Sequence, residues 1–73
     1  MSSRYEHYSM VIQWSEENDA YLVTIPEFPG LITHGDTYEE AAKNGQEVLE
    51  VWIEACEESG RPIPAPRVMK KSA

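Results

Sequence analysis

The chain has 73 residues, of which 41% are hydrophobic, and its 13 acidic and 6 basic residues give a formal net charge of −7. This length allows one domain, and a core of this size supplies only about 3–5 kcal/mol of stability. Cys56 is the single cysteine, which excludes an internal disulfide and is typical of a reducing compartment. We therefore expect a small acidic domain that gains stability by binding a partner or a second copy of itself.

The patterns of charge and hydropathy argue against several classes of protein. The chain does not open with a basic segment and an apolar run, and its apolar stretches are far shorter than the roughly 20 residues that span a membrane. The acidic excess repels nucleic-acid phosphates, because the few basic residues do not cluster. His7, His34 and Cys56 lack the spacing of metal ligands. We expect a cytoplasmic protein without a metal, a cofactor or a membrane partner.

Alternation of apolar and polar residues predicts two strands in the first third of the chain. The first covers residues 8–14 and the second covers residues 21–25. The polar residues 15–19 between them form a short connection, which predicts an antiparallel hairpin.

A rigid corner and a third strand follow. Pro26 ends the second strand because it has no N–H to donate, and Pro29 and Gly30 favour a tight change of direction. Residues 31–34 then predict a short third strand, which ends at Gly35.

The spacing of residues 37–60 predicts one long helix. Asp36 or Thr37 can cap it, and Glu40 lies three residues after Thr37, which is the spacing of a capping box. The apolar and small positions repeat as on one helix face: Tyr38, Ala41, Ala42, Gly45, Val48, Leu49, Trp52, Ile53 and Cys56. Gly45 on this face predicts a close approach to the sheet. Gly60 and Pro62 end the helix.

The predicted fold is therefore α+β, with the order β-β-β-α and the helix packed on one face of a three-stranded antiparallel sheet. Residues 61–66 are locked by prolines, and residues 67–69 allow a short final edge strand. We expect a single domain over residues 1–73, with an ordered core at about 8–68 and loose termini.

Three segments in this order resemble a known family. They are YLVTIPEFPG at residues 21–30, GDTYEEA at residues 35–41 before the long helix, and Gly60 with PIPAP at residues 62–66. Together they resemble the N-terminal domain of HicB-family antitoxins, over residues 8–66. The resemblance implies a partial RNase H-like fold without nuclease activity.

The resemblance also implies a partner. HicB antitoxins bind HicA, a small basic toxin ribonuclease, and mask its RNA-binding surface. Many relatives add a C-terminal DNA-binding segment, for which the residues after Pro66 are too few, so we do not expect this chain alone to bind an operator. The alternative is an orphan HicB-like transcriptional regulator, or an oligomeric scaffold domain, without a cognate toxin.

Catalysis is not expected, so the chain is predicted not to be an enzyme. RNase H-type hydrolysis needs several carboxylates converging on metal ions, usually with one on the first strand. The predicted first strand has no acid, Asp19 lies in a turn, and Asp36 lies at a helix start. His34 has no nucleophile beside it in sequence.

Several side chains have competing interpretations. Cys56 and Trp52 lie on the apolar helix stripe and are expected in the core. Trp14 is also predicted to be a core residue, with a dimer contact as the alternative. Phe28 on the corner could enter the core or anchor a partner. The glutamates on the outer helix face could be simply solvated or could complement a basic toxin.

A surface for the toxin is predicted at the corner and at the start of the helix. Its candidate residues are Glu27, Phe28, Pro29, His34, Asp36 and Glu39. A three-stranded sheet also has two edges, and an uncovered edge favours pairing with a second copy. We therefore expect a homodimer or a higher homo-oligomer.

Overall fold

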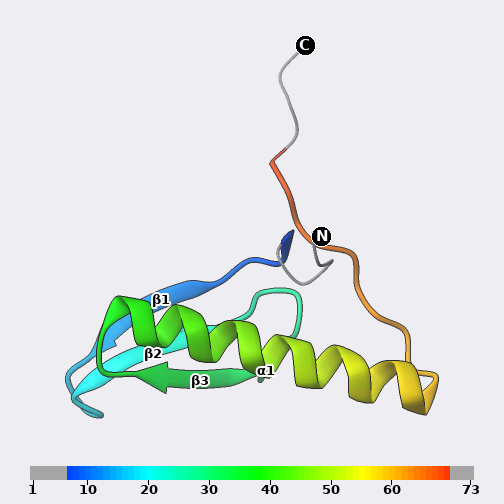
Figure 1. The fold of residues 1–73 in the computed structure, drawn as a ribbon. Helices are drawn as coiled ribbons and strands as arrows, with labels where there is room; N and C mark the ends of the chain where they lie inside the picture. Colours follow the sequence, from blue (N-terminus) through cyan, green and yellow to red (C-terminus); the bar gives the residue numbers. More distant parts are fainter. Residues whose placement is uncertain (1–6, 70–73) are drawn as a thin grey trace.

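The computed structural model describes residues 7–69, which form three strands and one helix (Figure 1). These elements are β1 (Val11–Ser15), β2 (Ala20–Thr24), β3 (Ile32–Gly35) and α1 (Tyr38–Ser59). The strands form one antiparallel sheet in the order β1-β2-β3. The predicted α+β fold is confirmed.

The β1–β2 hairpin is continuous from Val11 opposite Thr24 to Ser15 opposite Ala20. In its turn, the Ser15 hydroxyl accepts hydrogen bonds from the backbone and side-chain nitrogens of Asn18, at 3.2 and 3.0 Å. The first strand begins later than predicted. Extending the register would place Ser9 opposite Pro26, which has no N–H to donate, so the ladder stops there.

Both ends of α1 are capped as the sequence predicts. Thr37 is the N-cap, and its hydroxyl accepts a hydrogen bond from the Glu40 N–H at 3.0 Å. The Glu40 carboxylate reaches back to the Asp36 N–H at 2.7 Å. At the other end Gly60 is left-handed, with φ 70°, and Arg61 N–H donates to the Cys56 carbonyl. These bonds satisfy terminal groups that the helix itself leaves unpaired.

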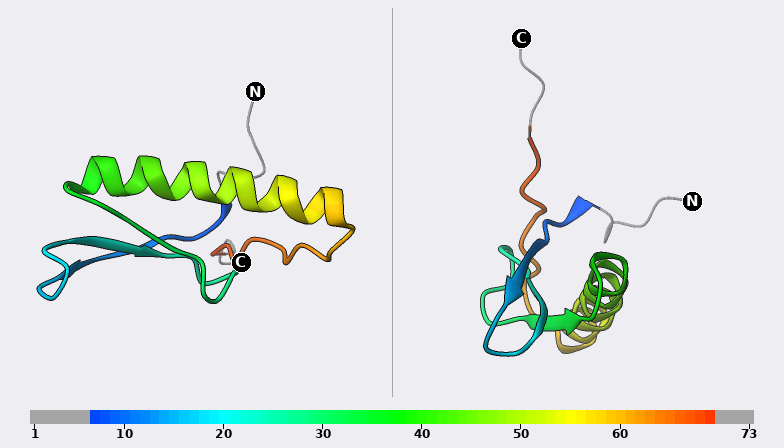
Figure 2. Two further views of the ribbon diagram at one scale, coloured as in Figure 1. Left: turned by 90° about the horizontal axis from the view of Figure 1, so that it is seen from below. Right: turned by 90° about the vertical axis from the view of Figure 1, so that its left-hand side faces the viewer.

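The helix covers one face of the sheet, and no other helix or strand within residues 7–69 covers the opposite face (Figure 2). Its buried stripe consists of Ala41, Gly45, Leu49, Ile53 and Cys56. A Cβ on Gly45 would lie 2.7 Å from Met10 Sδ and 3.1 Å from Val23 Cγ1, which confirms the predicted close approach. The predicted burial of Cys56 is also confirmed.

The predicted burial of Trp14 is wrong, because its side chain is 50% exposed. Trp14 lies at the hairpin end of the sheet, where the first turn of α1 presents Tyr38. The Tyr38 ring packs on Tyr21 with a centroid distance of 4.3 Å, and Trp14 meets the other side of Tyr21 edge-on at 5.0 Å. This aromatic row leaves one face of Trp14 open to solvent.

After the helix, residues 61–69 fold back as an irregular segment, which we call the strap. The short final strand predicted at residues 67–69 does not form. Ile63 packs against the core, and the Tyr8 hydroxyl donates to the Pro64 carbonyl. The strap is held by side chains and by the core rather than by a strand ladder. Its main polar anchor is Glu27, at the corner.

Candidate protein-interaction surface

The corner between β2 and β3 is built from two successive turns. Phe28 N–H donates to the Ile25 carbonyl at 2.9 Å, and Leu31 N–H donates to the Phe28 carbonyl at 3.0 Å. Gly30 takes a φ of 92°, which strongly favours glycine. Phe28 turns inward, is only 8% exposed and packs on Tyr8, so it is a core residue.

The carboxylate of Glu27 is buried inside this corner, with 4% of the residue exposed. It accepts hydrogen bonds from the Ser9 N–H at 3.2 and 3.3 Å, from the Ser9 hydroxyl at 3.1 Å and from the Arg67 N–H at 2.8 Å. One side chain therefore connects Ser9, in the segment before β1, with the corner and the strap.

These hydrogen bonds also set the ionisation of Glu27. Burial alone raises the pKa of the carboxyl, but the N–H groups of Arg67, Glu27 and Ser9 and the Ser9 hydroxyl hold this pKa below its ordinary value. Glu27 is therefore a charged acceptor at neutral pH, and its carboxylate accepts hydrogen bonds from residues of the same chain. No local sequence pattern indicates this role, because its partners are 18 and 40 positions away.

An apolar hollow of about 290 Å³ lies between the corner and the helix. Its lining residues are Glu27, Phe28, Pro29, Gly30, Leu31 and Trp52. The predicted burial of Trp52 is wrong, since this side chain is 40% exposed. The buried helix stripe runs through Leu49 and Ile53, and Trp52 lies at its flank, where it forms a wall of the hollow instead of filling the core.

A smaller hollow of about 150 Å³ lies on the other side of Trp52. It is lined by Trp52, Ala55, Cys56, Ser59 and Arg61. The indole of Trp52 thus stands between two depressions. A half-exposed tryptophan beside an apolar hollow is the kind of feature that anchors protein interfaces.

The outer face of α1, opposite its buried stripe, is acidic. Glu47, Val51, Glu54 and Glu58 are exposed and spaced four, three and four residues apart, so they lie on one side of α1. Val48, Trp52 and Ala55 form the adjacent row towards the sheet. We call the apolar side chains around the corner hollow the Trp52 patch: Pro29, Leu31 and Trp52. Glu54 and Glu58 lie farther round the helix, on its outer face.

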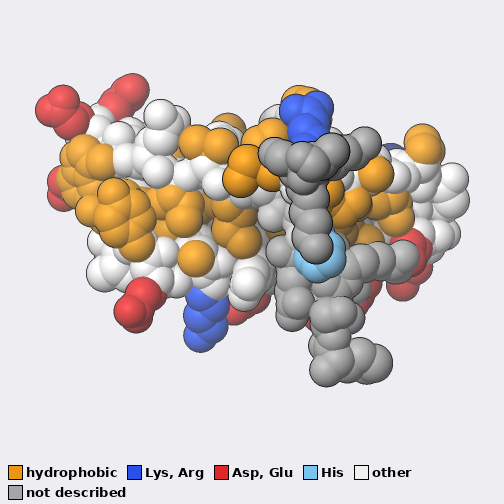
Figure 3. All heavy atoms as spheres, turned by 90° about the horizontal axis from the view of Figure 1, so that it is seen from above, with side chains coloured by type: hydrophobic (Ala, Val, Ile, Leu, Met, Phe, Trp, Pro, Cys, Tyr) orange, Lys and Arg blue, Asp and Glu red, His pale blue; other side chains and the backbone are white. Residues whose placement is uncertain are grey.

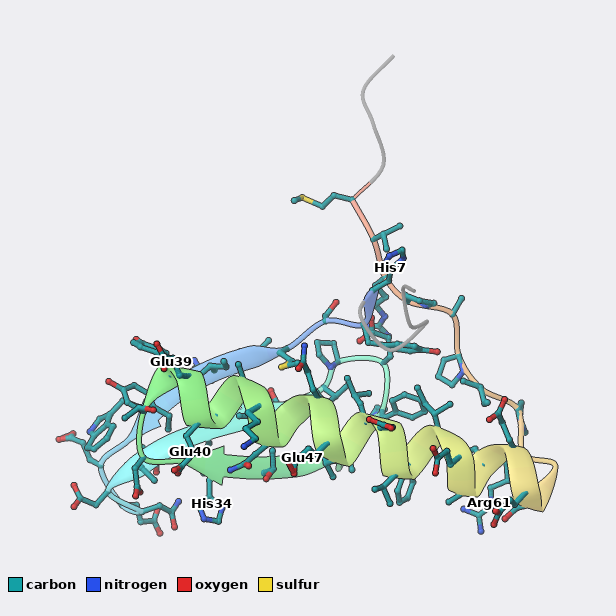
Figure 4. The ribbon with its side chains drawn as sticks, in the orientation of Figure 1. His7, His34, Glu39, Glu40, Glu47 and Arg61 are labelled. Carbon is teal, nitrogen blue, oxygen red and sulfur yellow. The ribbon has the colours of Figure 1, made fainter. Side chains whose placement is uncertain are left out.

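The other predicted contact residues lie elsewhere. His34 is exposed on β3, and Glu39 is exposed in the first turn of α1 (Figure 4). Asp36, just before the helix, is also exposed. They are separated from Glu27, Phe28 and Pro29 by the length of β3. The structure therefore divides the six candidates into a corner group and a helix-start group. Within residues 7–69 the structure contains no group of three or more His, Cys, Asp or Glu residues that could hold a metal ion.

Sequence comparison decides the family. The family model described as "HicB_like antitoxin of bacterial toxin-antitoxin system" matches residues 8–73. The chain belongs to the HicB-like antitoxin family. The resemblance seen in the corner and helix motifs is thereby confirmed across nearly the whole chain, and an antitoxin role in a toxin-antitoxin system is supported at the level of the family.

Two curated relatives are similar to this HicB-like chain. The "UPF0150 protein Ta0767" of Thermoplasma acidophilum is 35% identical over 54 residues, which cover 74% of this chain and 78% of that protein. An "uncharacterized 14.9 kDa protein in rep-hol intergenic region" of Haemophilus phage HP1 is 38% identical over 47 residues, or 64% of this chain. The match covers only 35% of the phage protein. No solved structure matches.

Within the described part of this HicB-like chain, α1 is not apolar enough to cross a membrane. Its outer face carries a series of glutamates, so its apolar residues form a stripe rather than a continuous run.

Proposed function

We propose that this chain is an antitoxin that neutralises a small, basic, HicA-type toxin ribonuclease by covering its RNA-binding surface. The observation that carries the proposal is the family match over residues 8–73. The formal charge of −7 supports a basic partner, because opposite charges accelerate encounter and select against wrong partners. The chain acts by binding rather than by catalysis, in the cytoplasm.

We further propose that the toxin docks on the Trp52 patch. A surface that binds RNA carries basic side chains around exposed aromatic or apolar groups, and the apolar patch together with the acidic outer face of α1 complements it. Trp52 and Leu31 offer apolar contact beside the hollow, and Glu54 and Glu58 supply negative charge on the outer face of the same helix. Desolvated aromatic anchors supply most of the affinity of such interfaces, while charges at the rim chiefly set the association rate.

The corner residues have distinct places in this proposal. Pro29 is exposed and meets the toxin directly, whereas Glu27 and Phe28 hold the corner from within. His34, Asp36 and Glu39 remain a second predicted contact, at the start of α1. A toxin that reaches both groups must extend along the edge formed by β3 and the helix.

Co-expression tests the proposal. Each open reading frame beside the gene is expressed alone and together with this chain, and growth and co-purification are measured. We expect one small basic product that arrests growth alone and becomes harmless and co-purifying with this chain. If none of the neighbouring products is toxic or binds, the antitoxin proposal fails and the orphan alternative gains support.

A further inference from the structure

The outer edge of β1 is the uncovered edge of the sheet. At the opposite edge, α1 packs chiefly along β3, and the Asn44 side chain from the helix donates to the His34 carbonyl at 2.8 Å. The strap contacts Tyr8 and Ser9, which precede β1. Among the described residues, no segment pairs with the outer side of β1.

β1 also lacks the features that normally prevent an edge strand from pairing with another chain. Natural edges carry charged residues, prolines or bulges, which prevent pairing with another chain. Residues 11–15 read VIQWS, without any charge or proline, and their register with β2 is free of bulges. This neutral edge is unusual in a chain with a net charge of −7. Two copies can meet along β1 without bringing their acidic helix faces together.

Apolar side chains are exposed along this strand. Val11 is 40% exposed and Trp14 is 50% exposed, on opposite faces of β1. Seen from above, hydrophobic side chains form a band from the hairpin end towards the middle of the molecule (Figure 3). Tyr21 supports Trp14 edge-on, so this aromatic surface is ordered before any partner binds.

We propose that two copies of the chain pair their β1 strands antiparallel about a two-fold axis through Gln13, which joins their sheets into one. In this register Gln13 faces Gln13, and Ile12 of each copy faces Trp14 of the other. The two Ile12–Trp14 pairs lie on the helix-covered side. Pairs of a β-branched and an aromatic side chain are favourable across antiparallel strands. Such a self-complementary contact closes at two copies.

Charges beyond the strand fit the same register. The position opposite Ser9 is Glu17 of the second copy, within an acidic turn that also contains Glu16 and Asp19. Arg67 lies beside Ser9, because its carbonyl accepts a hydrogen bond from the Ser9 hydroxyl. Each basic Arg67 thereby lies near the acidic turn of the other copy. We therefore expect a second copy, rather than a basic toxin, to pair with β1. Residues 11–15 contain no acidic side chain that could pair with the basic groups of a toxin.

Two variants of the full chain test the dimer. Trp14→Lys should raise the dissociation constant of the dimer at least about tenfold in analytical ultracentrifugation, because it places a charge at the centre of an apolar contact. Ile32→Lys, which introduces the same charge at an exposed apolar residue of β3, at the other edge of the sheet, should leave the dimer intact. Circular dichroism establishes that both variants are folded.

A disulfide tests the register independently of stability. In the proposed dimer the two Gln13 Cα atoms are about 4.5–5.5 Å apart, which suits a disulfide bond. The exposed Gln13→Cys variant should form a covalent dimer under mild oxidation, in which two thiols lose two electrons and two protons to the added oxidant. The exposed Gln46→Cys control should not.

The proposal is overturned if the chain is monomeric at all concentrations and the Gln13→Cys variant forms a disulfide-linked dimer no faster than the Gln46→Cys variant. A dimer that survives Trp14→Lys and does not link through Gln13→Cys overturns it as well. Protection of the β1 amides from hydrogen exchange that appears only after toxin is added would assign this edge to the toxin instead. The measurements of dimer dissociation and of cross-linking do not depend on whether the chain neutralises a toxin.

Discussion

Glu27 connects parts of the chain that are far apart in sequence. Its buried carboxylate receives hydrogen bonds from Ser9 and Arg67, so it fixes the segment before β1 and the strap to the corner. Glu27→Gln keeps the shape but removes the charge and replaces one of the two acceptor oxygens by an NH2 donor among other donors. We expect a loss of about 1–3 kcal/mol in the free energy of unfolding, measured by urea denaturation. Glu54→Gln on the exposed helix face should change it by less than about 0.5 kcal/mol.

The same carboxyl gives stability a defined pH dependence. The pKa of Glu27 is lower in the folded chain than in the unfolded chain, so its contribution is present above the unfolded pKa and is lost as the pH falls through the folded pKa. The difference in stability between the wild type and Glu27→Gln should therefore be largest near neutral pH and shrink below about pH 4. A difference that stays constant from neutral to strongly acidic pH would contradict this role.

The sequence predicts the burial of some side chains correctly and of others wrongly. Cys56 and Gly45 were placed correctly, because helix periodicity alone decides which side of α1 faces the sheet. Trp52 and Trp14 were placed wrongly, because periodicity assigns a side but does not show where the sheet beneath it ends. The buried bonds of Glu27 come from distant segments and follow from no local pattern.

The junction of β3 and α1 depends on close backbone packing. A Cβ added to Gly35 would lie 2.4 Å from the Ala41 nitrogen and 2.7 Å from its Cα, and these backbone atoms are held by the first turn of the helix. We expect Gly35→Ala to lower the free energy of unfolding by at least about 1–3 kcal/mol, as in other overpacked sites. Chemical denaturation checks this value.

Gly45→Ala is the matched substitution inside the helix. Its Cβ would meet chiefly Met10 Sδ, which belongs to a flexible side chain that can move away. Alanine also improves helix propensity by about 1 kcal/mol. The net change should be much smaller than for Gly35→Ala. Equal losses in the two variants would show that the helix does not approach the sheet as described.

The elements themselves were predictable because several local signals agree for each of them. Thr37 with Glu40 predicts the start of α1, and Gly60 predicts its end. The final strand was not predictable in the same way. Residues 67–69 allow an extended edge, but the strap is fixed by Glu27 and by Ile63 on the core, which depend on the folded corner.

The charge of the whole molecule should govern its association with a toxin. Replacing Glu54 and Glu58 by lysine reverses the charge on the outer face of the helix that carries Trp52, so we expect slower association with the toxin and a weaker dependence on salt. Glu16→Lys, in the hairpin turn far from the patch, should change the rate less for each charge altered. Stopped-flow association at two salt concentrations measures both effects. Equal effects per charge would show that only the net charge matters.

The most direct test of the account is the affinity of the purified chain for the toxin identified by co-expression. Isothermal titration calorimetry compares the wild type with Trp52→Ala and with Met69→Ala, an exposed apolar control, after circular dichroism has established that each is folded. The account predicts that Trp52→Ala weakens binding by about thirtyfold or more, as expected for an aromatic anchor, and that Met69→Ala binds like the wild type. An unchanged affinity for Trp52→Ala would contradict it.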